Sequence, residues 1–455
     1  MIFRRRTMFF MALATLSLSW LSSLNAQEGY TPVASLKTLE LQDGDSIVFL
    51  GDSITHQCLY TQYVEDYFYT RFPHMRLKLH NAGVGGARAW DALQRFDADV
   101  AAYKPKYVTI LLGMNDGTYR PFDQPTWETY RADMTELLGK LEGIGATPIP
   151  MTPTMFDSRA DRMKPKNNRP EDSTALYNSV LTYYGTWLRE VAGEKGYGFV
   201  DMWGPLNNIT MEQRKTDPAF TLIKDAVHPG PDGQVVMAVA IVNDLGLSRS
   251  VSSIRLTQGK DKWNGHAAGG ELSDIEATEQ GVAFTFHGTS LPWVMPPEAQ
   301  LGVELTKLGH RLSKESLEVH GLPAGKYTLS IDGEVVGTYS SDALARHIEL
   351  QGNDKTPQYQ QALKIALLNK KRNEGPVRGL RGEWGRFQGF ARDRRNAEQN
   401  PDNAELQAKV QKLTEVMAGI EDRVAQHNAA AKEIEDQIFQ ENQPKAHRYV
   451  LQRAE

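Results

Sequence analysis

A serine with the surroundings of a nucleophile occurs early in the chain. Gly51-Asp52-Ser53 directly follow the predominantly apolar run 46–50, so we expect Ser53 in a tight turn where a strand ends. Gly51 lets the backbone leave the strand sharply, and the next residues can open a helix whose N–H groups favour a developing negative charge. The same three residues also occur as a plain helix cap, so a catalytic role needs a base elsewhere.

A base and a carboxylate to orient it stand together much later in the chain. Asp225 and His228 are three residues apart in one predicted loop. A carboxylate can hold one imidazole nitrogen while the other takes the proton of a serine hydroxyl. Asp and Pro are also frequent in solvated turns, so this segment alone does not establish catalysis.

Two further segments offer donors for the oxyanion of acyl transfer. Asn115 comes just after the predicted strand at residues 107–112, so its amide can reach the same crevice. Gly86 follows another predicted strand, and a glycine lets a substrate approach the backbone N–H closely. Each segment alone is typical of an ordinary turn.

Short apolar runs must position these residues. Between Ser46 and Gly246, the runs alternate with longer amphipathic stretches, which is typical of an α/β fold with a parallel sheet. Such sheets carry their functional loops at the carboxyl ends of the strands. The predicted strands are SIVFL, RLKLH, YVTILL, ATPIPM and GFVDM.

The four segments occur together and in order, each at a strand end or in a final loop. Over residues 44–246 the chain therefore resembles the SGNH or GDSL hydrolase family, whose four signature blocks correspond to Ser53, Gly86, Asn115 and His228. Ile54-Thr55 stand where the namesake motif has Leu. No Gly-x-Ser-x-Gly motif surrounds Ser53, which argues against the α/β-hydrolase fold.

The resemblance implies a flavodoxin-like three-layer α/β/α sandwich. It implies Ser53 as nucleophile, His228 as base and Asp225 as its orienting group, with no metal or organic cofactor. It also implies an oxyanion hole of the Ser53 and Gly86 N–H groups and the Asn115 side chain. A different loop spacing would put Gly83 or Gly85 in the place of Gly86.

The 455 residues predict several units. Residues 1–26 have the arginines and apolar run of a signal peptide, so we expect export to the periplasm or beyond, with an uncleaved anchor as the alternative. We expect a hydrolase domain over 35–249, a β-rich region over 250–350 and a helical region over 356–455. No later segment is apolar enough for a membrane span.

The last region contains a coiled-coil-like seam and a basic stretch. From Leu406 to Ile438, apolar residues recur at spacings of four and three, which predicts packing on the chain's own helix near 358–372 or on another chain. Residues 364–395 hold ten Lys or Arg against three acidic residues, a net of +7 in a chain of net charge −5. This stretch either pairs with acidic neighbours or contacts an anionic polymer.

The expected activity is hydrolysis of an O-acyl ester, most simply removal of O-acetyl groups from a carbohydrate, with no nucleic-acid partner. The alternatives are a lipolytic esterase or thioesterase, and a non-catalytic scaffold that binds a glycan or a partner. Trp90, Tyr119, Phe122 and Trp127 could line the crevice. Residues 290–300 could form a lid over it.

Overall fold

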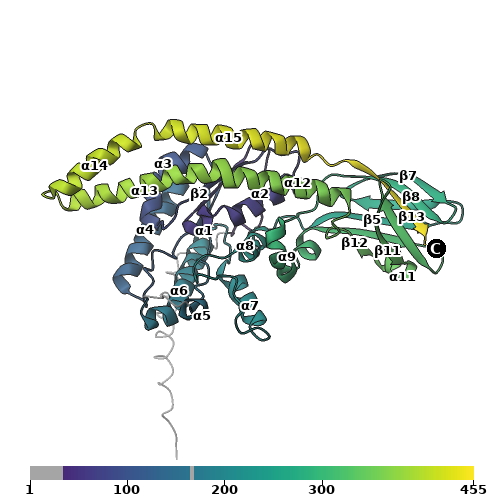
Figure 1. Ribbon diagram of the computed structural model, residues 1–455, viewed down its shortest axis with the longest axis horizontal. Helices are drawn as coiled ribbons and strands as arrows, with labels where there is room; N and C mark the ends of the chain where they lie inside the picture. The colour runs from purple at the N-terminus through teal and green to yellow at the C-terminus, as the bar shows by residue number, and fades with distance from the viewer. Residues whose placement is uncertain (1–33, 164–168, 455) are drawn as a thin grey trace, which may run out of the picture.

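The structure is a computed structural model that describes residues 34–163 and 169–454 (Figure 1). The predicted signal segment, residues 1–26, lies outside the described residues. None of the described helices combines the length and the apolar character that crossing a bilayer requires.

Four parallel strands form the first sheet, in the order β2-β1-β3-β4. The fifth expected strand, residues 198–202, contributes only an isolated parallel bridge between Val200 and Met151. The strands are β1 (Ser46–Gly51), β2 (Lys78–Gly83), β3 (Tyr107–Leu111) and β4 (Thr147–Pro150).

Both faces of this sheet are buried, which explains why β1 carries apolar side chains on both faces. Successive side chains of β1 point to opposite faces. Ile47 and Phe49 belong to one hydrophobic core, whereas Val48 and Leu50 belong to the other. The sheet is therefore the middle layer of three.

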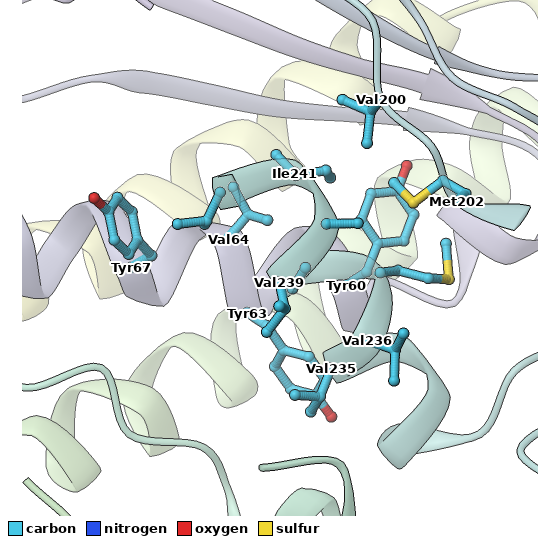
Figure 2. Close-up of a cluster of buried hydrophobic side chains, with 14 of the residues drawn as sticks. Tyr60, Tyr63, Val64, Tyr67, Val200, Met202, Val235, Val236, Val239 and Ile241 are labelled. Atoms are coloured by element: carbon cyan, nitrogen blue, oxygen red, sulfur yellow. The ribbon is translucent and has the colours of Figure 1, made fainter. Parts of the chain in front are cut away.

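Helices cover each face. On one face, α2 (Leu59–Arg71) and α8 (Pro231–Asp244) pack together and meet Val200 and Met202, as Figure 2 shows. The opposite face is covered by α3 (Ala89–Asp99), α4 (Gln124–Gly143) and α6 (Glu171–Lys195). The predicted three-layer α/β/α fold is confirmed.

The shorter helices lie in connections along the chain, some within this sandwich and some after it. They are α1 (Ser53–His56), α5 (Ser158–Arg162), α7 (Trp203–Gln213), α9 (Gln300–Thr306), α10 (Leu308–Leu312), α11 (Ser341–Arg346), and the 3₁₀ turns η1 (Ala101–Tyr103) and η2 (Pro297–Ala299).

Two further sheets enclose a separate core, as expected for a β-rich region. Their strand orders are β11-β10-β13-β8-β7 and β12-β9-β5-β6. The expected hairpin at Asp332-Gly333 joins β10 to β11, with both residues at positive φ. The strands are β5 (Ser250–Gln258), β6 (Trp263–Ala268), β7 (Gly270–Thr278), β8 (Gly281–Gly288), β9 (Lys314–His320), β10 (Lys326–Ile331), β11 (Glu334–Ser340), β12 (Ile348–Glu349) and β13 (Ala446–Arg453).

Strand β13 departs from the expectation of a helical region over 356–455. The helices end at Glu441, and residues 446–453 return to the β-rich region, where β13 pairs with both β8 and β10. Tyr449 and Leu451 are buried in the core of that region. The C-terminal helices are thus inserted between two parts of one β structure.

The helices themselves form a long hairpin (Figure 1). One arm contains α12 (Pro357–Arg372) and α13 (Arg378–Gln399), joined by a π-helical turn, η3 (Asn373–Val377). The other arm contains α14 (Ala404–Met417) and α15 (Ile420–Glu441). The first arm packs on α2 and α3, and this packing brings it to the loops at the sheet's edge.

The apolar seam follows the second arm. Helix α15 packs on α12 and α13, and α14 packs on α13. Ala431 and Ile438 are buried, whereas Val410 and Leu413 are half-buried. The spacing allowed the seam to pack on the chain's own helix or on another chain. In the described residues, it packs on the chain's own helices.

The basic stretch is largely neutralised. Seven of its ten side chains pair with carboxylates, so the stretch presents less free positive charge than its composition suggests. The pairs are Lys364–Glu441, Lys370–Glu298, Arg372–Glu65, Arg381–Asp99, Arg386–Glu383, Arg392–Asp91 and Arg394–Glu398.

Residues 290–300 do not form a lid. Trp293 is buried, its indole N–H donates to the Tyr63 carbonyl oxygen over 2.8 Å, and its ring packs against Tyr67. The segment packs against α2, where its apolar side chains are removed from water.

Candidate active site

Ser53 lies where β1 ends and α1 begins. The carboxylate of Asp52 caps α1 by accepting the Ile54 N–H over 2.9 Å. Gly51 is required by close packing, because a Cβ atom there would lie 2.1 Å from Thr55 Oγ1. This turn holds the Ser53 hydroxyl at the carboxyl edge of the sheet, as expected.

His228 faces Ser53 from the loop that precedes α8. Its Nε2 lies 2.8 Å from Ser53 Oγ, and its Nδ1 lies 2.6 Å from Asp225 Oδ2. The N–H groups of Val227 and His228 donate to Asp225 Oδ1 over 3.0 and 2.7 Å. The structure therefore brings the three predicted residues together in a hydrogen-bonded chain.

The charge of Asp225 follows from these contacts. Partial burial alone would raise its pKa, but hydrogen bonds from the His228 side chain and from the His228 and Val227 backbone outweigh burial and hold the pKa of Asp225 well below its usual range. An ionised Asp225 can orient the His228 ring and stabilise its protonated form.

The backbone N–H of Gly86 is available to an oxyanion. Gly86 has φ +67°, a conformation that favours glycine. The two other glycines considered for this role donate elsewhere: Gly83 to Asn81 Oδ1 over 2.9 Å and Gly85 to His56 Nδ1 over 3.1 Å. Within residues 34–163 and 169–454, neither Gly86 nor Ser53 donates its N–H to a protein acceptor.

Asn115 lies beside these donors. Its Nδ2 donates to the Ala87 carbonyl oxygen over 3.1 Å and to Asp52 Oδ2 over 3.5 Å, and these two contacts orient the amide. The Tyr119 hydroxyl donates to Asn115 Oδ1 over 3.1 Å. The amide thus has its oxygen fixed and a hydrogen directed towards the loop that carries Ser53.

Asp116 ties two of the signature blocks together, a role that the sequence reasoning missed. Its carboxylate accepts the Ala89 N–H over 2.8 Å and the Gly113 N–H over 2.9 Å. Burial raises the pKa of Asp116, and also that of Asp52, to about 7. In the sequence, only the position of Asp116 next to Asn115 pointed to a role for Asp116 in the site.

The four aromatic residues proposed to line the crevice lie in different surroundings. Tyr119 contacts the site through Asn115, and the guanidinium of Arg395 lies over the Trp90 ring. Trp127 is buried in the core, and Phe122 lies on the surface against Tyr183. Cys58 is buried as well, and burial raises the pKa of its thiol to about 12.

No metal site accompanies these residues: in the part of the chain that the structure describes, no three or more His, Cys, Asp or Glu side chains are grouped to hold an ion. A three-layer sandwich with a Ser-His-Asp chain and N–H donors at its edge defines an SGNH-type hydrolase. Residues 49–236 match the model of the GDSL-like lipase/acylhydrolase family, so this part of the chain is a GDSL-like hydrolase domain.

Two sequence relatives cover part of the chain. An acetylxylan esterase of Geobacillus stearothermophilus is 25% identical over 232 residues, which is 46% of this chain and 97% of the esterase. An uncharacterized lipoprotein of Bacillus subtilis, YqeF, is 35% identical over 78 residues, which is 17% of this chain and 32% of the lipoprotein.

One solved structure matches nearly the whole chain. It is a gut microbial diltiazem-metabolizing enzyme, 27% identical, with a TM-score of 0.77 over 92% of this chain and 99% of the enzyme. The β-rich region and the helical hairpin are thus shared with that enzyme. The chain described here is an SGNH-type enzyme that hydrolyses ester bonds.

Proposed function

We propose that the enzyme removes O-acetyl groups from a carbohydrate by means of Ser53, His228 and Asp225. The observation that supports this site most strongly is the hydrogen-bonded chain from Ser53 Oγ through the imidazole to Asp225. The relative named as an acetylxylan esterase supports the choice of acyl group and alcohol.

In the proposed reaction, Ser53 Oγ forms a bond to the ester carbonyl carbon while its proton passes to His228 Nε2. The negative charge on the carbonyl oxygen is stabilised by the N–H groups of Ser53 and Gly86 and by the Asn115 amide. When the tetrahedral intermediate collapses, the alcohol leaves with the proton from His228. Water then repeats the two steps on the acyl-enzyme, releasing the acid and restoring Ser53.

A substrate series tests this proposal. The purified enzyme is assayed with nitrophenyl acetate, butyrate and octanoate and with acetylated xylan, beside Ser53→Ala and a matched control, Ser253→Ala, at an exposed strand residue. We expect acetate release from the polysaccharide, lower rates with octanoate, and loss of activity in Ser53→Ala alone. Faster turnover of octanoate would favour a lipolytic esterase instead, because each buried methylene contributes about 0.8 kcal/mol.

Full activity of Ser53→Ala would reject Ser53 as the nucleophile. A fluorophosphonate probe adds an independent measurement, since it labels an activated serine whatever the natural ester. Absence of labelling in the unmodified enzyme would favour the scaffold alternative.

We also propose that residues 1–26 direct export to the periplasm or the medium, on the strength of their arginines and apolar run. Cell fractionation of the full chain and of a chain that lacks residues 2–26 tests this. Retention of the full chain in the cytoplasm would contradict export.

For the domains we propose a hydrolase unit over 35–249, an accessory β unit over 250–350 and a helical unit from 356, with β13 assigned to the β unit. The pairing of β13 with β8 and β10 supports this last assignment. Limited proteolysis followed by mass spectrometry tests the boundaries. Cleavage within 35–249 before any cleavage near residue 250 or 356 would contradict them.

A further inference from the structure

Helix α13 contacts the loop that carries Gly86, although the two are separated by about three hundred residues of sequence. Gln388 Nε2 donates to the carbonyl oxygen of Gly85 over 2.9 Å, and Arg392 Nη2 donates to that of Gly86 over 2.7 Å. The Gln388 side chain is buried, with 4% of its surface exposed. Two successive carbonyl groups of the loop are thus held from one helix.

The hydrogen bond from Gln388 also fixes the direction in which the N–H of Gly86 points. The Gly85 carbonyl and the Gly86 N–H belong to one planar, trans peptide unit, so they point in opposite directions. Fixing the carbonyl towards Gln388 therefore directs the N–H away from α13. A hydrogen bond accepted by a carbonyl also polarises its peptide unit and strengthens the N–H as a donor.

The buried carboxylate of Asp91 holds Arg392 in place for its contact with the Gly86 carbonyl. Arg392 Nε and Nη2 donate to Asp91 Oδ1 and Oδ2 over 2.8 and 2.6 Å, and Asp91 Oδ2 also accepts the backbone N–H of Arg88 over 2.8 Å. Asp91 lies in the first turn of α3, which follows the glycine loop. The hydrogen bonds to Asp91 raise the pKa of Arg392, and their bidentate geometry fixes the orientation of the guanidinium.

We propose that Gln388 and Arg392 are positioning residues that aim the Gly86 N–H at the developing oxyanion. The proposal rests on the proposed function of Ser53 and Gly86. It assigns a role in the reaction to the helical hairpin, which contributes neither nucleophile nor base.

Gln388→Met tests the first contact, because methionine keeps the length and apolar volume of the side chain but cannot donate a hydrogen bond. An oxyanion donor acts mainly in the transition state, so we expect kcat for nitrophenyl acetate to fall about tenfold or more with KM nearly unchanged. The control is Gln399→Met, the same change at an exposed residue of the same helix. It should keep the unmodified kcat.

Active-site titration with a fluorophosphonate probe separates positioning from unfolding, since kcat is then expressed per reactive serine. Arg392→Ala provides a second variant in case Gln388→Met does not fold, and it should lower kcat in the same way. Arg392→Lys, which keeps one donor for the Gly86 carbonyl, should recover part of the lost kcat. Arg394→Ala, at an exposed ion pair with Glu398, is its control.

An unchanged kcat per titrated site in both Gln388→Met and Arg392→Ala would overturn the proposal. So would a fall in activity that titration attributes entirely to fewer reactive sites. These results are distinguishable from failure of the proposed function: in that case Ser53→Ala retains activity, whereas here Ser53→Ala is inactive and only the positioning variants behave as the unmodified enzyme.

Discussion

The hydroxyl of Tyr119 donates to Asn115 Oδ1, so one side of the candidate oxyanion amide is fixed by a residue four positions along the chain. Thr118 and Tyr119 both have positive φ, at 56° and 54°, which is costly for residues other than glycine. The Tyr119 ring is held against Tyr177, with centroids 5.1 Å apart. Packing thus maintains a strained loop that presents the hydroxyl to Asn115.

Tyr119→Phe removes this hydrogen bond alone. A hydrogen bond of this kind contributes about 1 kcal/mol, so we expect kcat to fall about fivefold while KM changes little. Steady-state kinetics with nitrophenyl acetate measure both. Tyr183→Phe, at a half-exposed ring on α6, is the matched control, and equal kinetics in the two variants would contradict a role for the Tyr119 hydroxyl.

Asn115→Ala removes the donor itself. We expect a loss of about 3 kcal/mol of transition-state stabilisation, equivalent to a fall of about a hundredfold in kcat. Because Asn115 Nδ2 also donates to the Ala87 carbonyl, the thermal melting temperature must be measured in parallel. Retention of more than half of the kcat by a folded variant would remove Asn115 from the oxyanion hole.

The stability of the fold should depend on pH through His80. This ring stacks on Tyr103 and contacts Asp99; burial, which outweighs the Asp99 contact, lowers the pKa of His80 to about 4. A group whose pKa is lowered on folding stabilises the protein above its unfolded pKa of 6.5, and that contribution is lost as the pH falls towards 4.

Urea unfolding at pH 7 and pH 5 measures this contribution. The unmodified protein should lose about 2 kcal/mol more between the two pH values than His80→Gln does, from 1.36 kcal/mol per pH unit. The subtraction cancels the other titrating groups. Equal losses in the two proteins would show that His80 does not titrate between these states.

A buried ion cluster joins the helical hairpin to the hydrolase domain. Arg381 donates to both oxygens of Asp99, over 2.8 and 2.7 Å, and Arg95 donates to Asp99 and to the Ala82 carbonyl at the end of β2. All three charged side chains are buried. Asp99 is therefore shared between α3 and α13.

Asp99→Ala would leave two buried guanidinium groups without their carboxylate, so we expect a loss of about 3–5 kcal/mol in the free energy of unfolding. Asp436→Ala, which breaks the exposed pairs with Lys432 and Arg76, should cost about 1 kcal/mol or less. Urea denaturation of both variants provides the comparison. Similar losses would mean that the cluster contributes no more than a surface pair.

The sequence was sufficient to predict an α/β fold because short apolar runs alternate with longer amphipathic stretches, and parallel strands bring their carboxyl ends to one edge. The three layers followed from the resemblance to the SGNH family. The rule for parallel strands also predicted that Ser53, Gly86 and Asn115 would be neighbours. The catalytic assignment of these residues remains a prediction for the kinetic tests.

The contributions of the helical hairpin, of β13 and of the segment around Trp293 could not be predicted in this way. Gln388 and Arg392 reach the glycine loop only because α13 docks on α3, and no local pattern specifies how two such distant segments pack. The apolar run Tyr449-Val450-Leu451 is compatible with a strand, but its partners β8 and β10 are set by tertiary pairing. The apolar run that contains Trp293 suits a lid and a core segment equally, since periodicity does not distinguish them.

Strand β13 lies between β8 and β10, so the middle of the five-stranded sheet is supplied by residues that the ribosome adds after the whole helical hairpin. Until then, β8 and β10 each expose an unpaired edge, a condition that favours pairing with other chains. The order of synthesis thus delays completion of the accessory unit. A molecular chaperone that shields strand edges would be most useful to this protein during that interval.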